Sequence, residues 1–231
     1  MRGYTAPMTV TETAAAAAAV GRRERKKQRT REALIDAAFA LFAEKGFEAT
    51  TVEEIADAVD VSSRTFFRYF ASKEDVALTF QAEQHDAVFA ALAERPADEP
   101  VITALRRAAV SMARACELGE LGFDPSRFQC LMDLIRDSPA ILAGSLEHAQ
   151  KKQIALTGAL AERMGVDPAD DLRPHIAAST AIAAFQAATD VMRCGRLGYR
   201  ALSEAVDAAF ALIEEGLNFP SNAPTGPTDE V

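Results

Sequence analysis

Tryptophan is absent from the 231-residue sequence, and cysteine and histidine each occur only 3 times. The histidines lack the spacing of metal ligands. The cysteines form no Cys-x-x-Cys pair and are too widely separated to predict a disulfide framework, so we expect them to be small buried thiols in a reducing cytosol; they are Cys116, Cys130 and Cys194. We therefore expect a cytoplasmic protein with no metal site and no cofactor.

Catalytic and membrane signatures are missing as well. The sequence contains no GxSxG, P-loop, GxGxxG or HExxH motif, so we expect no enzyme. No apolar run is long enough to span a bilayer. The Ala14–Val20 run precedes its cationic cluster, whereas a secretory signal has its cations before its apolar region. We predict no membrane association.

Alanine is abundant, and alanine favours helix. No segment alternates apolar and polar residues with the period of two that is typical of strands. The length allows one large domain or two small ones, with a substantial core. We therefore predict an all-α protein of about nine helices.

Charge is distributed unevenly along the chain, whose net charge is -9. Residues 1–31 carry eight Arg and Lys against two Glu, and residues 1–80 balance at twelve basic and twelve acidic residues. Residues 81–231 hold thirteen basic and twenty-two acidic residues. This pattern favours a nucleic-acid reader in the N-terminal part, followed by a module that does not bind nucleic acid.

The stretch Gly46–Lys73 reads as the end of one helix, a short second helix, a turn and a third helix. From Val61 to Lys73 it has no Asp or Glu, while cations, hydroxyls and aromatic rings follow one another closely. Cations neutralise phosphates and hydroxyls bond phosphates or base edges, so this composition suits the DNA major groove. The alternative is a small helical subdomain with a solvated basic face.

Capping residues predict where the first two helices begin. We expect the first helix over residues 30–45, with Thr30 as its N-cap. The second is expected over 52–59, and its start has the capping-box spacing of Thr51 and Glu54.

The third helix is expected over 62–70, with Ser62 as its N-cap. Phe66 and Phe70, four residues apart, lie on one face and are predicted to pack against the first two helices. The residues left on the outward face are Ser63, Arg64, Phe67 and Arg68.

Four segments together resemble the N-terminal DNA-binding domain of the TetR family of transcriptional regulators; they are Phe42–Phe47 (FAEKGF), Thr50–Val52 with Ile55–Ala56, Val61–Ser62 and Thr65–Glu74 (TFFRYFASKE). The resemblance covers about residues 29–78. It implies a three-helix domain with a helix-turn-helix, an all-α regulatory domain behind it, and a homodimer bound to double-stranded operator DNA.

The resemblance also assigns roles: phosphate contacts at the start of the second and fourth helices, base contacts early in the third, and backbone contacts late in the third. With the basic cluster before the first helix, the predicted DNA-binding set is Arg29, Thr50, Thr51, Ser62, Ser63, Arg64, Thr65, Phe67, Arg68, Tyr69 and Lys73. Members of the family usually have Tyr where this sequence has Phe67, and often a small residue where it has Arg64. Arg64 therefore suggests an added guanine contact.

The domain organisation follows from composition. We expect a flexible basic arm over 1–28, a DNA-binding domain over 29–75, a regulatory domain over 76–218 and a disordered tail over 219–231. Pro and Gly punctuate the regulatory region into helices. The fourth helix of the chain is expected to run to about residue 95. Five more are expected over 101–118, 125–137, 139–164, 172–194 and 199–217.

The last two helices are the predicted dimer interface. Segments 172–194 and 199–217 carry narrow alanine faces on which another helix can approach closely. A hairpin from each protomer would form a four-helix bundle. Packing within one chain is the alternative.

The regulatory half is expected to contain a ligand pocket, as the resemblance implies. Large soft side chains that suit a pocket wall are Phe89, Met112, Phe128, Met132 and Phe185. Such residues at helical spacing are also typical of plain core. Residues 127–189 resemble, without a diagnostic motif, actinobacterial-type regulators with acyl-CoA-like ligands.

We therefore predict a homodimeric repressor that is released from DNA by a small lipophilic or acyl-CoA-like effector. The alternatives are a DNA-binding regulator without an effector and a helical protein-interaction module.

Overall fold

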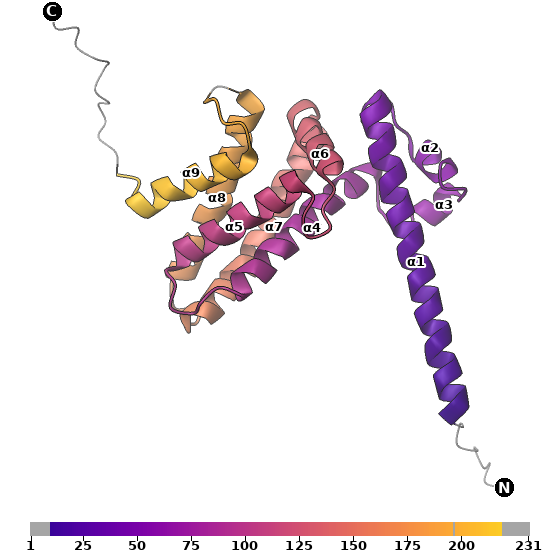
Figure 1. Cartoon of the computed structure of the whole chain (residues 1–231), viewed down its shortest axis with the longest axis horizontal. Helices are drawn as coiled ribbons and strands as arrows, with labels where there is room; N and C mark the ends of the chain where they lie inside the picture. Colours follow the sequence, from indigo (N-terminus) through magenta and orange to yellow (C-terminus); the bar gives the residue numbers. More distant parts are fainter. Residues whose placement is uncertain (1–9, 196, 219–231) are drawn as a thin grey trace, which may run out of the picture. The chain divides into compact units, whose positions relative to one another are not determined.

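The computed structural model describes residues 10–195 and 197–218, with side chains from residue 23 onward. Within these ranges the chain folds into nine helices and no strand, which confirms the predicted all-α class (Figure 1). The helices are α1 (Val10–Lys45), α2 (Val52–Asp57), α3 (Ser63–Phe66), α4 (Lys73–Ala93), α5 (Val101–Leu118), α6 (Pro125–Asp137), α7 (Pro139–Met164), α8 (Arg173–Cys194) and α9 (Leu202–Glu215).

The chain divides into two compact units, with the boundary between Thr79 and Phe80, inside α4. The first unit contains α1, α2, α3 and the first turns of α4. The second contains the rest of α4 and α5 to α9. Each unit has its own apolar core and is described by itself.

Helix α1 begins much earlier than predicted. It runs without a break from Val10 to Lys45, so the arm predicted to be flexible is helical from Val10 onward. Thr30 is not an N-cap; it lies inside the helix, and its hydroxyl donates to the carbonyl of Lys26 at 3.1 Å. The alanine run and the Arg, Lys and Gln residues after it are strong helix formers, which explains why the helix continues through them.

The core of the first unit is aromatic. Phe42 at the end of α1 packs against Phe47 at 5.1 Å between ring centroids, and Phe66 packs against Phe70 at 5.6 Å. All four rings are buried. Gly46 makes the sharp exit from α1 at φ 86°, a left-handed conformation that glycine adopts without strain.

In the second unit, α5 packs against α9, α8 against both α7 and α9, and α6 against α7. Helices α5, α6 and α7 have the predicted bounds, and α8 begins one residue later than expected. Helix α9 is shorter than the predicted 199–217 at both ends. The predicted tail over 219–231 lies outside the described residues.

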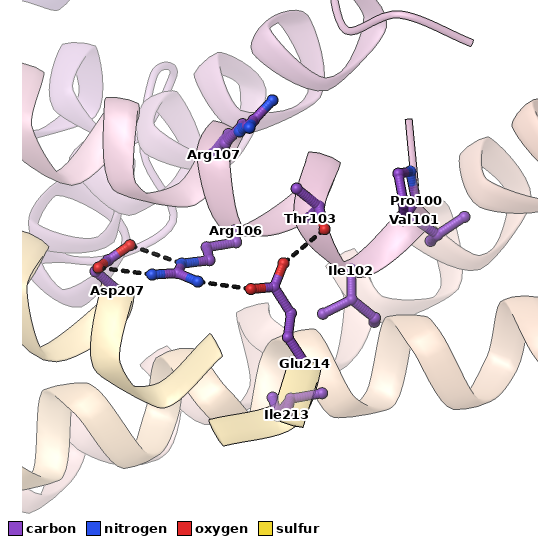
Figure 2. A pocket seen from close by; sticks show the side chains of 9 residues that line it. All are labelled: Pro100, Val101, Ile102, Thr103, Arg106, Arg107, Asp207, Ile213 and Glu214. Carbon is purple, nitrogen blue, oxygen red and sulfur yellow. Dashed lines mark hydrogen bonds and ion pairs between the residues drawn. The ribbon is translucent and has the colours of Figure 1, made fainter. Parts of the chain in front are cut away.

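Polar contacts fix α9 against α5. Arg106 makes a bidentate pair with Asp207 at 2.7 and 2.8 Å and also bonds Glu214 at 2.6 Å, and Thr103 donates to the same Glu214 (Figure 2). These bonds raise the pKa of Arg106 above its usual value, so its guanidinium stays protonated. The same residues line a surface hollow of about 740 Å³ at this junction, and these charged side chains are paired with one another.

The beginning of α9 has no capping side chain of its own. Glu117, near the end of α5, takes that role by accepting from the backbone N–H of Ser203 at 3.0 Å and from its hydroxyl at 2.7 Å. A carboxylate at a helix N-terminus satisfies free N–H groups and meets the positive end of the helix dipole.

Candidate nucleic-acid interface

Helix α2 begins with the predicted capping box. The Thr51 hydroxyl accepts from the N–H of Glu54 at 3.3 Å, and the Glu54 carboxylate accepts from the N–H of Thr51 at 2.9 Å. Lys45 at the end of α1 forms an ion pair with the same carboxylate. The bonds from Lys45 and Thr51 lower the pKa of Glu54 from 4.5 to about 2. This cluster ties the start of α2 to the end of α1.

The turn after α2 sets the direction of α3. Asp60 adopts φ 56°, a left-handed conformation that Asp tolerates better than most residues. The N–H of Val61 then returns to the carbonyl of Ala56 at 3.0 Å. Ser62 caps α3 as predicted, because its hydroxyl accepts from the N–H of Thr65 at 3.2 Å.

The regular part of α3 is shorter than the predicted 62–70 and ends at Phe66. Beyond it the chain continues in tight turns, with the N–H of Arg68 bonding the carbonyl of Thr65 at 3.2 Å and that of Tyr69 bonding Phe66 at 2.8 Å. These i to i+3 bonds are tighter than α-helical ones and rotate the last side chains relative to an ideal helix.

The faces of α3 are as predicted except for Ser63, which was expected to face outward and is half-buried. Phe66 is fully buried, whereas Phe67 is 55% exposed beside exposed Arg64 and Arg68. Among the residues the structure describes, Arg64 has no ion-pair partner. A large aromatic ring exposed between two cations is unfavourable in water, and it becomes favourable against a sugar or a thymine methyl. The outward face is therefore suited to a groove of DNA.

The remaining α3 residues are partly engaged. The hydroxyls of Ser62 and Thr65 lie 3.1 Å apart and bond each other. Arg68 lies over the ring of Tyr69 at 5.2 Å, and its Nη2 donates to the Tyr69 hydroxyl at 3.4 Å. Ser63 is half-buried between the exposed residues Ser62 and Arg64. Arg68 and Tyr69 thus form one unit with a charge and a hydroxyl at its edge.

Two side chains predicted to contact phosphate bond to the protein itself. Thr50 is 1% exposed, and its hydroxyl donates to the carbonyl of Gly46 at 2.8 Å. The ammonium of Lys73 donates to the carbonyls of Phe47 at 2.8 Å and Thr50 at 3.0 Å and lies 4.4 Å from the Phe47 ring centroid. Both side chains hold the loop between α1 and α2 in place by donating to its carbonyls.

The basic cluster before the predicted first helix lies on α1. Arg29 is exposed there, as are the side chains of residues 23–28. Arg31 is half-buried and lies over the ring of Phe70 at 5.4 Å. The cations are therefore carried on a helix rather than on an arm without regular structure. The alanine run followed by strong helix formers was the signal that could have predicted this.

Three of the five predicted ligand-binding residues line one cavity in the second unit: Met112, Met132 and Phe185. Phe89 does not line this cavity, and Phe128 packs against Phe80 and borders a different hollow. The sequence reasoning missed the polar side chains that α4 contributes, Gln81, Gln84 and His85. Helix α4 also carries Lys73, Glu74, Asp75, Glu83 and Asp86, so its sequence does not single these three residues out.

The fold and the exposed acid-free face of α3 define the class: a transcriptional regulator that binds DNA through a helix-turn-helix. None of the described helices is both long and apolar enough to cross a membrane. Residues 34–79 match the model of bacterial regulatory proteins of the tetR family, and residues 99–218 match the MftR C-terminal domain. The chain belongs to the TetR family.

Individual relatives agree with this assignment. The chain is 41% identical over 172 residues to the HTH-type transcriptional regulator TcmR of Streptomyces glaucescens, across 74% of this chain and 76% of TcmR. It is 46% identical over 46 residues to the repressor KstR2 of Mycobacterium tuberculosis, across 20% of this chain and 23% of KstR2. The structure of Thermus thermophilus FadR in complex with lauroyl-CoA shares the fold at a TM-score of 0.50 and 24% identity, over 85% of this chain and 99% of FadR.

Proposed function

We propose that this protein is a homodimeric repressor that leaves its operator when a small lipophilic effector binds the second unit. The exposed, acid-free face of α3, on a helix-turn-helix fixed by buried aromatic rings, is the observation that supports it most strongly. KstR2, to which this chain is 46% identical over 46 residues, is named as a repressor.

The recognition surface is centred on Arg64, Phe67 and Arg68. A guanidinium can bond the O6 and N7 atoms of guanine together, which makes Arg64 the base-reading residue of this set. Phe67 contributes an apolar contact, and Arg68 with Tyr69 contacts the phosphate backbone. The surface also includes Arg29, Thr51, Ser62, Ser63 and Thr65.

The dimer forms through α8 and α9. Helix α8 exposes Ile176, Ala183 and Ala187 along one side, and α9 exposes Leu212. Small side chains allow close helix approach, and exposed Ile and Leu supply apolar area that pairing removes from water. A symmetric pair presents two recognition helices to half-sites about 34–36 Å apart, or a multiple of that distance.

Effector control follows from the cavity in the second unit. Its volume of about 120 Å³ is below the roughly 300–1,000 Å³ of usual ligand pockets, so a larger ligand must separate the surrounding helices. A ligand that binds the separated form better shifts the population toward it. Release follows if that form holds the two recognition helices at a different spacing. The lauroyl-CoA in Thermus thermophilus FadR supports a lipophilic effector.

The test is Arg64→Ala, measured by fluorescence anisotropy on an operator selected from random duplexes. We expect about a 10- to 100-fold loss of affinity and relaxed preference at one base pair, because one bidentate contact disappears. Arg114→Ala, which removes an exposed arginine on α5, is the matched control and should leave affinity unchanged. Equal affinities for the two variants would show that α3 does not read this operator.

A further inference from the structure

The cavity in the second unit is enclosed by helices α4 to α9, and most of its wall is apolar. Leu105 and Met112 from α5, Leu131 and Met132 from α6, Phe185 from α8 and Phe210 from α9 form that wall. Their soft and aromatic side chains suit a hydrocarbon or ring system rather than a polar body.

One side of the cavity is polar, and it comes from a single helix. Gln81 and His85 lie four residues apart on α4, so their side chains are neighbours on the same face. Gln81 is only 9% exposed; its Nε2 donates to the hydroxyl of Ser145 at 2.8 Å. The Oε1 atom of Gln81 and the Nδ1 atom of His85 are both buried without a hydrogen-bond partner.

Buried polar atoms without a partner are rare, because losing water without gaining a hydrogen bond is costly. Two such atoms belong to residues one helical turn apart that line the same cavity. The neighbouring Gln84 is already paired, since its Nε2 donates to the sulfur of Cys116 at 3.4 Å. These two atoms without partners therefore indicate a site for a ligand that can form hydrogen bonds.

The charge of the wall limits what that occupant can be. No Arg or Lys is among the described residues that line the cavity, and its one carboxylate is Asp190. Lys152, which acts electrostatically on His85, is paired with Asp86 at 3.0 Å. Burial is the main cause that lowers the pKa of His85 from 6.5 to about 4, so the ring is neutral near pH 7. An anionic group in this cavity would lose its water and gain no cation.

We infer that the cavity binds an uncharged, largely apolar molecule carrying a hydroxyl group, which hydrogen-bonds Gln81 and His85. A hydroxyl both donates and accepts, so one hydroxyl can donate to Gln81 Oε1 while its oxygen accepts from the N–H of His85 Nδ1. This inference rests on the proposed function, in which the same cavity receives the effector. It places the long anionic headgroup of an acyl-CoA outside the cavity.

The test compares three probes that share one ring system: 2-naphthol, naphthalene and 2-naphthoate. Binding to the full-length dimer without DNA is measured by calorimetry at pH 7. We expect 2-naphthol to bind at least about tenfold more tightly than naphthalene, and 2-naphthoate to bind most weakly. Equal affinity for naphthol and naphthalene would show that water already satisfies the two atoms. Tighter binding of 2-naphthoate or of lauroyl-CoA would show that the cavity selects anions. Either result overturns the inference.

Two variants localise the effect. Gln81→Met keeps the length of the side chain and removes the acceptor, so 2-naphthol should lose about tenfold in affinity while naphthalene does not. Ser145→Ala is the matched control, because it removes the Gln81–Ser145 bond and leaves the Oε1 atom of Gln81 in place; it should keep the preference for naphthol. If Gln81→Met keeps that preference unchanged, the assignment to Gln81 is wrong. The comparison of probes on the unaltered protein does not depend on how either variant folds.

Operator binding is measured separately with each probe at saturation. Selective binding of 2-naphthol without any change in operator affinity would retain the ligand class and reject effector-controlled release. Loss of selectivity with intact operator binding would reject the ligand class and retain the DNA-binding function.

Discussion

The outward face of α3 and the cavity in the second unit differ in the environment of their unpaired polar groups. On α3, Arg64 has no ion-pair partner among the described residues, and water solvates it at no cost. In the cavity, Gln81 Oε1 has no partner and no access to water. The first surface therefore gains affinity by neutralising phosphates, and the second by completing hydrogen bonds in a low-dielectric site. The same contrast predicts how each responds to salt, charge, mutation and pH.

Salt should separate the two surfaces most strongly. Raising salt from 50 to 200 mM is expected to lower operator affinity by about 10³-fold or more, because counterions compete for the phosphates. Binding of 2-naphthol to the cavity should change by less than about twofold, since no charge pairs form there. Anisotropy and calorimetry across the same salt series measure both. A cavity affinity that falls as steeply as the operator affinity would contradict the contrast.

A charge placed on the dimer face should break DNA binding and spare the cavity. Ala183→Arg puts a cation on the face of α8 that we propose as the dimer interface, where its two symmetric copies would repel each other; this is expected to weaken the dimer by about 100-fold or more. Operator affinity should fall with it, while 2-naphthol affinity changes little. Sedimentation gives the assembly state. Ala155→Arg, on an exposed position of α7, is the control and should remain dimeric.

Lys73 distinguishes a positioning residue from a phosphate contact. In Lys73→Met the carbonyl of Thr50 loses the ammonium donor, and that of Phe47 keeps only the N–H of Thr50, so the first unit should be destabilised by about 1–3 kcal/mol. Hydrogen exchange at the α2 and α3 amides measures this loss. The salt dependence of operator binding should keep its slope. A slope reduced by about one would show that Lys73 binds a phosphate after all.

The smallest expected effects come from pH, and they fall in different windows for the two units. Burial, Lys152 and His148 lower the pKa of His85, and Asp86 acts in the opposite direction. The contribution of His85 to the stability of the second unit is therefore full above pH 6.5 and declines as pH falls toward 4. The lowered pKa of Glu54 makes the first unit lose stability between pH 4.5 and about 2. Hydrogen exchange should show the second unit weakening first. In Glu54→Gln the first unit should no longer lose stability between pH 4.5 and about 2, while the second unit should still weaken toward pH 4.

Local signals predicted much of the fold. Pro125 and Pro139 mark the starts of α6 and α7, and Gly119, Gly165 and Gly195 follow the ends of α5, α7 and α8 in left-handed conformations. These residues act within one turn, so their effect can be read without knowing the fold. The outward and inward faces of α3 were predictable for the same reason, from the four-residue spacing of Phe66 and Phe70.

Contacts that depend on the folded loop and on distant residues could not be predicted. Lys73 donates to the carbonyl of Phe47, 26 positions earlier. The hydroxyl of Thr50 turns back to the carbonyl of Gly46, which only the conformation of the loop reveals. The polar side of the cavity was missed because Gln81 and His85 become informative only when Ser145 and α8 are placed around them.

Helix α1 has a consequence for how the protein meets DNA. Its 36 residues make a rod about 54 Å long, and the side chains of residues 23–29 on it are exposed. Helicity without tertiary contacts is set by local propensity and declines with temperature. The cations on this segment should therefore hold a regular spacing in the cold and lose it on warming, so that operator association carries a heat-capacity signature from helix ordering as well as from buried area.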